Sequence, residues 1–303
     1  MLLKIFNTLF RHDFWGIGVV NSPISSFLNP DFKPEVIFLQ HPKKGKSFAD
    51  PFGIFKDGKL TILCEDFDYS PGKGIISAVQ PSADFSSLSK AKALEFPFHA
   101  SYPFILKHNN EIFCIPETSE ANEVCLYKAT EFPKKLAKVA TIIKGISVLD
   151  PTVFFYEKKW WLFGSPKEKG SRELFIWHAN DLFGPWEPHK KNPVKRNISS
   201  SRPAGTPFLY NGFLYRPSQD CSSTYGGRVI INRVKTLTPD NFEEEIASVV
   251  EPIKGSPFPD GIHTLSAAGN ITLIDGKRHV FRTADFFRNA ARMPGAIARR
   301  ILP

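Results

Sequence analysis

Two aspartates that each precede a proline are the residues best suited to chemistry in this sequence. Asp50 lies in "FADPF" and Asp150 in "LDPTVFFYEKKWWLFGSP". Two carboxyls facing one pocket can act on a glycosidic bond, one as base or nucleophile and the other as an acid of raised pKa. An aspartate before a proline is also a common turn former, so a structural role is the alternative for either residue.

Two further carboxyls are candidates for the proton donor of such a pair. Glu117 lies in "CIPETSE" and Asp220 in "YRPSQDC", each near the end of an expected strand. A proline beside each one limits the continuation of the strand and fixes the direction of the side chain. For Glu117 a plain surface carboxylate remains the alternative.

The segments around these residues repeat along the chain. Each unit has a polar or small residue, an X-Pro step, an apolar strand, a polar turn and a second apolar strand, and the units cover 48–66, 99–117, 149–166, 202–220 and, more loosely, 260–281. A third β-rich segment follows the first four, at 74–80, 123–130, 173–180 and 228–235. A repeat of roughly 50 residues built from short strands is typical of propeller blades.

The sequence therefore predicts an all-β, five-bladed β-propeller with short terminal extensions. The 28 Phe, 7 Tyr and 5 Trp favour strands, and the 25 Pro and 20 Gly favour turns. We expect residues 1–285 to form the propeller, with the strand at 15–24 closing the ring against the last blade, and residues 286–303 to form a basic tail. A β-sandwich is the alternative fold.

In a propeller, the first strand of each blade lines the central axis, so the repeats should bring their leading residues together. The expected catalytic carboxyls are Asp50, Asp150, Glu117 and Asp220. The expected substrate-binding residues are His99, Tyr102, Arg202, Arg216, Gln219, Tyr225, Asp260 and His263. Charged groups that converge in this way cost desolvation energy unless they are paired or used.

The roles of His263 and of the aromatic residues are left open by the sequence. His263 could be a structural histidine, a sugar contact or a ligand of an axial divalent metal, and no other cofactor is indicated. Tyr225 could stack on a sugar ring, whereas Trp160 and Trp161 fit the core between blades.

Composition narrows the partners and the compartment. The net charge is +9, but the lysines are scattered and no nucleic-acid motif is present, so we expect no nucleic-acid partner. Four cysteines without a CxxC pair predict free thiols and a cytoplasmic protein. The termini "MLLKIFNTLFRH" and "FFRNAARMPGAIARRILP" could lie on an anionic membrane surface, or the tail could pack against the propeller.

The positions of Asp50 and Asp150 in the repeat resemble two acidic residues of five-bladed propeller glycoside hydrolases of the arabinanase, xylosidase and invertase types. The resemblance implies that Asp50 is the base or nucleophile and that Asp150 tunes pKa values and orients substrate. Those enzymes carry a general-acid glutamate in blade four, where this chain reads "YRPSQDC". Asp220 or Glu117 would then have to donate the proton.

A second resemblance covers residues 13–285. The segments "FADPF", "IPETSE", "LDPTVFFYEKKWWLFGSP", "YRPSQDCSSTYGGRV" and "DGIHTLS" are similar to the N-terminal propeller domain of glucosamine inositolphosphorylceramide transferases. The resemblance implies a role with a glycan or glycolipid. Three hypotheses follow: an enzyme that hydrolyses or transfers sugars, a glycan-binding module, and a scaffold that partners a glycosyltransferase or another sugar-modifying enzyme.

Overall fold

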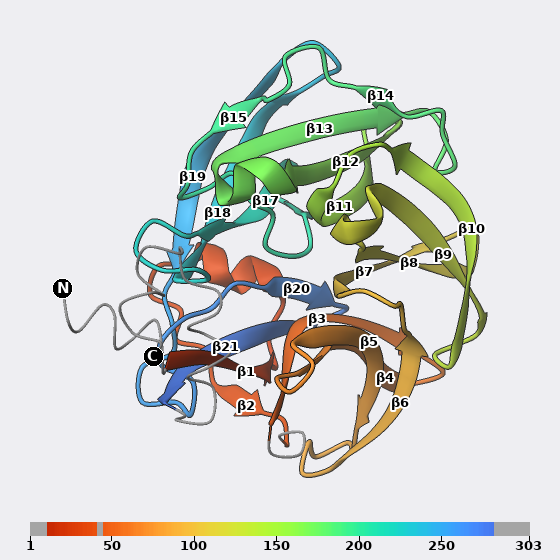
Figure 1. Cartoon of the computed structure of the whole chain (residues 1–303). Helices are drawn as coiled ribbons and strands as arrows, with labels where there is room; N and C mark the ends of the chain where they lie inside the picture. The colour runs from red at the N-terminus through yellow and green to blue at the C-terminus, as the bar shows by residue number, and fades with distance from the viewer. Residues whose placement is uncertain (1–10, 41–44, 282–303) are drawn as a thin grey trace, which may run out of the picture.

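Five antiparallel sheets surround a common axis in the computed structural model, which describes residues 11–40 and 45–281 (Figure 1). Each sheet has its first strand near the axis and its later strands farther out. The predicted five-bladed propeller is confirmed for these residues. The predicted basic tail at 286–303 lies outside them, so the boundary at 285 stays a prediction.

The blades follow the expected repeat, and their strands have these bounds. Blade one has β3 (Lys46–Lys56), β4 (Lys59–Asp68), β5 (Lys73–Pro81) and β6 (Leu88–Leu94). Blade two has β7 (Ser101–His108), β8 (Glu111–Glu117), β9 (Glu123–Glu131) and β10 (Lys135–Lys144). Blade three has β11 (Val148–Tyr156), β12 (Lys159–Pro166), β13 (Glu173–Ala179), β14 (Glu187–Pro188) and β15 (Lys195–Arg196). Blade four has β16 (Phe208–Tyr210), β17 (Phe213–Asp220), β18 (Arg228–Leu237) and β19 (Phe242–Val250).

The fifth blade combines the two ends of the described chain. Its strands are β20 (Leu265–Ala268), β21 (Ile271–Phe281), β1 (Arg11–Val20) and β2 (Val36–Phe38). The β1 strand pairs with β21 from Arg11 opposite Phe281 to Val20 opposite Thr272. This pairing closes the ring as predicted, although the strand begins four residues earlier than expected. Short 3₁₀ helices lie at η1 (Ile24–Leu28), η2 (Ser119–Ala121) and η3 (Lys167–Arg172).

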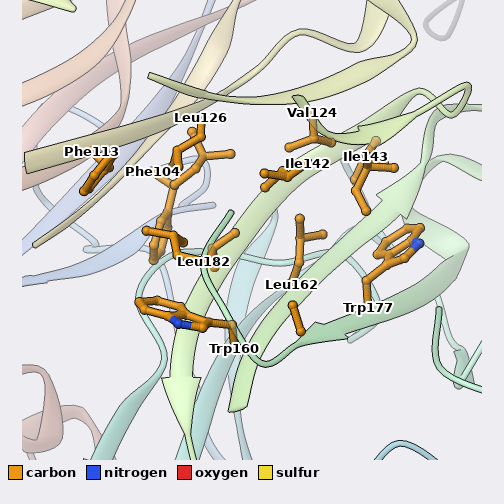
Figure 2. Packing of buried hydrophobic residues seen from close by; sticks show 14 of the residues in the cluster. Phe104, Phe113, Val124, Leu126, Ile142, Ile143, Trp160, Leu162, Trp177 and Leu182 are labelled. Atoms are coloured by element: carbon orange, nitrogen blue, oxygen red, sulfur yellow. The ribbon is translucent and has the colours of Figure 1, made fainter. Parts of the chain in front are cut away.

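The core is divided among the gaps between blades, because side chains alternate between the two faces of each sheet. In β12, Trp160 and Leu162 pack toward blade two, whereas Trp161 and Phe163 pack toward blade four. Figure 2 shows the gap between blades two and three, where Trp160 and Leu162 lie opposite Ile142 and other side chains of blade two. Full burial of one such side chain is worth roughly 1.5–3 kcal/mol.

A bulge at the start of three inner strands re-aims the residue before each proline. Asp50, Tyr102 and Asp150 have φ angles of 51°, 43° and 50°. The register of the first two strands of each of these blades shifts at the same place. A positive φ is uncommon for residues other than glycine, and such strain often accompanies a functional constraint. The repeat seen in the sequence is thus also a repeat of backbone conformation.

The cysteines are free thiols, as predicted, and Cys64, Cys114 and Cys125 are buried. Within the described ranges, no helix has the length and apolar character needed to cross a bilayer.

Candidate functional site

A cavity of about 440 Å³ lies at the axis and has a mostly polar and aromatic lining. Blades one, two, four and five and the closing strand contribute to it. The lining residues are His12, Asp13, Trp15, Ser47, Asp50, Glu65, Phe67, Tyr69, Gly72, His99, Ser101, Glu117, Arg202, Tyr225 and His263. Its size is within the range of small-molecule sites.

Asp50 is held in this cavity by its neighbours in blades two and five. Its carboxylate accepts hydrogen bonds from the Tyr102 N–H at 3.2 Å and from the Thr264 hydroxyl at 2.9 Å. Burial raises the pKa of Asp50 to about 6, while the positive charge of His263 opposes this rise. Asp50 is therefore largely ionised at neutral pH and can accept a proton.

His263 lies beside Asp50 and is oriented by Asp275, a buried residue of β21. The Nδ1 of His263 is 2.5 Å from Asp275 Oδ2, and its Nε2 is 3.8 Å from Asp50 Oδ1. Burial opposes protonation, but the carboxylates of Asp275 and Asp50 raise the pKa of His263. Trp15 stacks on the imidazole at 3.9 Å between ring centroids, which fixes the plane of the ring.

Asp50, His263 and Asp275 have ligand atoms within 4.8 Å of one another, the spacing of a metal centre. The Asp275 carboxylate, however, also accepts hydrogen bonds from the backbone N–H groups of Asp50, His263 and Thr264 at 2.9–3.1 Å. With His263 Nδ1, these donors occupy its four lone-pair positions. These three residues therefore form a hydrogen-bond network that does not fit a metal ion.

A second carboxyl pair joins blades two and three. The Asp150 N–H donates to Glu117 Oε2 at 3.0 Å. The Asp150 carboxylate accepts two hydrogen bonds from Arg202, at 2.5 and 3.2 Å, and one from Gln219 at 2.7 Å. Arg202 therefore neutralises Asp150 but not Asp50.

Among residues 11–40 and 45–281, no cation forms an ion pair with Glu117. Burial and the charge of Asp150 raise the pKa of Glu117 to about 8, with Arg202 opposing. Glu117 is consequently protonated at neutral pH while Asp50, in the same cavity, is mostly ionised.

Some of the predicted site residues do not line this cavity; they are Asp150, Asp220, Tyr102, Arg216, Gln219 and Asp260. Tyr102, Gln219 and Asp150 lie directly behind the lining and hold the residues in it. Asp260 accepts a hydrogen bond from the His279 N–H at 2.8 Å, at the edge of blade five.

The remaining two, Arg216 and Asp220, have structural partners in blade four. Arg216 donates to Glu244 at 2.6 and 2.9 Å and is 1% exposed. The Asp220 carboxylate accepts hydrogen bonds from Arg228 and from the Ser222 N–H. Burial alone would raise the pKa of Asp220, but these hydrogen bonds lower it below the usual value. A carboxyl with a lowered pKa is a poor proton donor, so the geometry favours Glu117 for that role.

Several lining residues were not identified from the sequence, above all Glu65, Trp15 and Tyr69. Glu65 is adjacent to Asp66, which faces Ser77 and Lys90 on the other side of the strand. The hydroxyl of Tyr69 donates to the Asp13 carbonyl oxygen at 2.6 Å and so joins the cavity rim to the closing strand. The "ED" pair in β4 and the aromatic start of β1 were the signals that could have pointed to them.

Aromatic rings form one side of the cavity. Tyr225 is 42% exposed and meets both His263 and Trp15 edge to face. The Arg202 guanidinium lies 5.3 Å from the centroid of the Tyr225 ring. These rings offer apolar faces beside the carboxyls, an arrangement suited to a sugar ring.

Comparisons with known proteins show the family of the chain. A family model described as glucosamine inositolphosphorylceramide transferase 1, N-terminal, matches residues 39–267. The chain belongs to this family. It is 33% identical over 248 residues to glucosamine inositolphosphorylceramide transferase 1 of Oryza sativa subsp. japonica, a match covering 76% of this chain and 33% of that protein. The Arabidopsis thaliana protein of the same name is 32% identical over 249 residues, covering 76% and 32%.

The chain thus spans about a third of the length of the curated relatives it matches. Solved structures with a similar fold include a family 117 glycoside hydrolase of Zobellia galactanivorans, with a TM-score of 0.56 and 16% identity over 88% of this chain and 91% of that one. Another is the catalytic domain of a GH62 α-L-arabinofuranosidase of Coprinopsis cinerea, with a TM-score of 0.55 and 10% identity over 82% and 95%. At these identities the likeness shows the fold alone.

Proposed function

We propose that the axial cavity binds a sugar residue of a glycan or glycolipid and acts on its glycosidic bond, with Glu117 as the proton donor and Asp50 as the base. The observation that carries the proposal is the placement of two buried carboxyls in one cavity with different neighbours, His263 and Thr264 beside Asp50 and Asp150 beside Glu117. The pKa of Glu117 is raised to about 8 and that of Asp50 to about 6. Acid–base catalysis needs one protonated and one ionised group at the working pH.

The residues behind the cavity support these roles. Glu117 donates its proton to the leaving oxygen as the glycosidic bond breaks, and Asp50 removes a proton from the attacking water or sugar hydroxyl. Asp150 raises the pKa of Glu117 and, through its N–H, fixes one carboxyl oxygen at 3.0 Å. Arg202 keeps the Asp150 charge balanced, so the cluster can be buried.

Family membership supports the substrate class. The relatives are named for transfer of glucosamine to inositolphosphorylceramide, a glycolipid. For this chain we propose only the class of ligand, a glycan or glycolipid head group that contains an amino sugar or an inositol.

Turnover of matched glycosides tests the acid role. The panel contains methyl and p-nitrophenyl glycosides of glucosamine, N-acetylglucosamine, arabinose and xylose. Glu117→Gln should lower the rate on the methyl glycosides by about 10²–10⁴-fold, and much less on p-nitrophenyl glycosides, whose leaving group needs no proton. Asp50→Asn should lower both rates.

The matched control is Asp220→Asn, because Asp220 is a similarly buried carboxyl bound to Arg228 away from the cavity. It should retain wild-type turnover. If Glu117→Gln lowered the rates on methyl and p-nitrophenyl glycosides equally, Glu117 would not be the proton donor.

The wild-type rate should also fall at both low and high pH. Below about pH 6 Asp50 gains a proton and stops acting as a base, and above about pH 8 Glu117 loses the proton that it donates. A bell-shaped profile of kcat/KM is therefore expected. Glu117→Gln should lose the alkaline limb and keep the acidic one.

A second candidate is a non-catalytic glycan-binding domain that serves a sugar-modifying partner. The observation that favours it is that the family model matching residues 39–267 is described as the N-terminal part of a transferase. In that case the cavity would hold the acceptor glycan, and Asp50→Asn would weaken binding with no turnover to lose. We also propose a cytoplasmic location and contact of the termini with a membrane; residues 1–10 and 282–303 lie outside the described residues.

A further inference from the structure

Glu65 and His99 form a polar pair on the cavity wall that the acid–base chemistry of Glu117 and Asp50 does not use. Glu65 lies on β4, and His99 lies in the connection between β6 and β7. Both line the cavity, and His99 Nε2 is 3.6 Å from Glu65 Oε1. This distance is longer than a hydrogen bond, so each group keeps its hydrogen-bonding capacity.

The tautomer of His99 follows from its backbone contact. The Gly74 N–H donates to His99 Nδ1 at 2.9 Å, so Nδ1 must carry a lone pair. The hydrogen of the neutral ring is then on Nε2, which faces Glu65. A second hydrogen bond, from the Ala100 N–H to the Gly74 carbonyl oxygen at 3.1 Å, holds this segment against β5.

Gly74 also makes room for the Glu65 side chain. A Cβ at position 74 would lie 2.7 Å from Glu65 Oε1 and 2.7 Å from the Ala100 carbonyl oxygen. Any larger residue would therefore displace Glu65 or the backbone that carries His99. The glycine at position 74 therefore leaves room for both Glu65 and the backbone next to His99.

The surroundings of both groups favour their neutral forms. Burial raises the pKa of Glu65 well above its usual value, and nearby carboxyls raise it further; these are Asp50 on β3, Glu117 on β8, Asp275 on β21 and Asp150 on β11. Burial lowers the pKa of His99, with Lys167 adding to this and Glu120 opposing it.

The Glu65 carboxyl has no hydrogen-bond partner within residues 11–40 and 45–281. The side chain is 12% exposed and lines the cavity, so its carboxyl is accessible to a molecule bound there. A ligand in the cavity can therefore hydrogen-bond to this carboxyl.

We propose that Glu65 and His99 are a pair of neutral hydrogen-bond donors that binds two acceptor oxygens of an uncharged polyol ring, a sugar or a cyclitol. The Glu65 O–H and the His99 Nε2–H supply the two donors. The pair thus forms a specificity subsite of the cavity and rests on the proposed function, since it assumes that a glycan or its head group binds there. Anionic ring substituents gain no salt bridge from this pair, in contrast to Arg202, which also lines the cavity.

The first test needs no ligand. In ¹⁵N-labelled protein at pH 7, the His99 ring should give the NMR signature of the neutral tautomer with hydrogen on Nε2. Gly74→Ala should change that signature, because it displaces the pair. A ring protonated on Nδ1 at pH 7 would overturn the inference whatever the glycan specificity.

The second test measures binding of methyl glucoside and myo-inositol by NMR titration at pH 7. Glu65→Gln keeps a neutral donor of the same shape and should bind within about threefold of wild type. Glu65→Leu has similar volume without a donor and should bind at least tenfold more weakly, the loss expected for one hydrogen bond with a buried partner. His99→Phe should show a similar loss, and melting curves establish that each variant is folded.

A pH series separates this role from a purely structural one. In the Glu117→Gln background, where that carboxyl no longer titrates, affinity should fall as the pH is raised and Glu65 loses its donor. Replacing Glu65 by Gln as well should remove that dependence. If the polyols bind to wild type and equally well to Glu65→Leu, the donor pair is contradicted but the proposed function is not. If neither polyol binds to wild type, both the donor pair and the proposed function are contradicted.

Discussion

At the scale of single residues, the site depends on which of two neighbouring acids faces the axis. Glu65 faces the cavity, whereas Asp66 binds Ser77 and Lys90 on the opposite side of β4. Side chains alternate along a strand, so a shift of one residue exchanges these roles. The sequence placed Asp50, Glu117, Arg202 and His263 in the site because prolines and repeats mark their register, but no such marker distinguishes Glu65 from Asp66.

Two residues of β17 show the same limit. Asp220 and Arg216 carry the right chemistry for an acid and an anion contact, but cations and carboxylates of blade four engage both. The partners Arg228 and Glu244 come from β18 and β19, so their pairing depends on strand register that a single sequence does not reveal. Composition could identify the reactive residue types but not these partners.

Glu117 should make the protein less stable as pH rises. Its folded pKa of about 8 lies above the value of about 4.3 for an unfolded glutamate, so the folded state holds an extra proton between these values. The free energy of unfolding therefore declines from about pH 4.5 to pH 8. Glu117→Gln should flatten this slope and raise the melting temperature by roughly 5 °C at pH 8.5.

Urea unfolding at pH 5 and pH 8.5 measures this effect. Glu111→Gln is the control, since Glu111 is an exposed carboxyl paired with Lys128 at a hairpin tip. Parallel pH slopes for wild type and Glu117→Gln would show that Glu117 ionises normally in the folded state.

At the scale of elements, bulged strand starts and close backbone contacts position the cavity. The bulges at Asp50, Tyr102 and Asp150 were visible in the sequence as X-Pro steps, although their left-handed conformation was not. In blade four, Gly205 precedes the X-Pro step at Thr206, has a φ of 126°, and contacts Leu265 of blade five through its backbone. This contact joins two blades at the axis without any side chain between them.

Gly205→Ala should be strongly destabilising. A Cβ at this position would lie 1.9 Å from the Leu265 carbonyl oxygen, and backbone cannot rotate away as a side chain can. We expect a loss of about 3 kcal/mol or more in the free energy of unfolding, from overpacking added to backbone strain. Denaturant melting would measure it.

Gly212→Ala is the matched control. Gly212 lies in the hairpin between β16 and β17 with a φ of 80°, and a Cβ there would meet no heavy atom within 4 Å, so only the strain remains. Its loss should be about 1 kcal/mol. Equal losses in the two variants would show that the Gly205 contact does not hold blades four and five together.

At the scale of the whole molecule, the ring brings residues far apart in the chain into one site. Thr264 donates to Asp50, and the Asp50 N–H donates to Asp275, so the seam between blades one and five is part of the cavity. Closure by β1 also places Trp15 against His263. The repeat predicted the five blades and the closing strand because both follow from local patterns. It did not predict which loops complete the cavity, since those contacts form only after closure.

The most direct test of the proposed site is the titration of its two carboxyls, followed by ¹³C NMR of side-chain-labelled protein. Asp50→Asn and Glu117→Gln assign the two resonances. The geometry predicts that Asp50 titrates near pH 6 and Glu117 near pH 8, so that one is ionised and the other protonated at neutral pH. If both carboxyls instead titrate near pH 4, as exposed acids do, the cavity holds no acid–base pair and the proposed catalytic role is wrong.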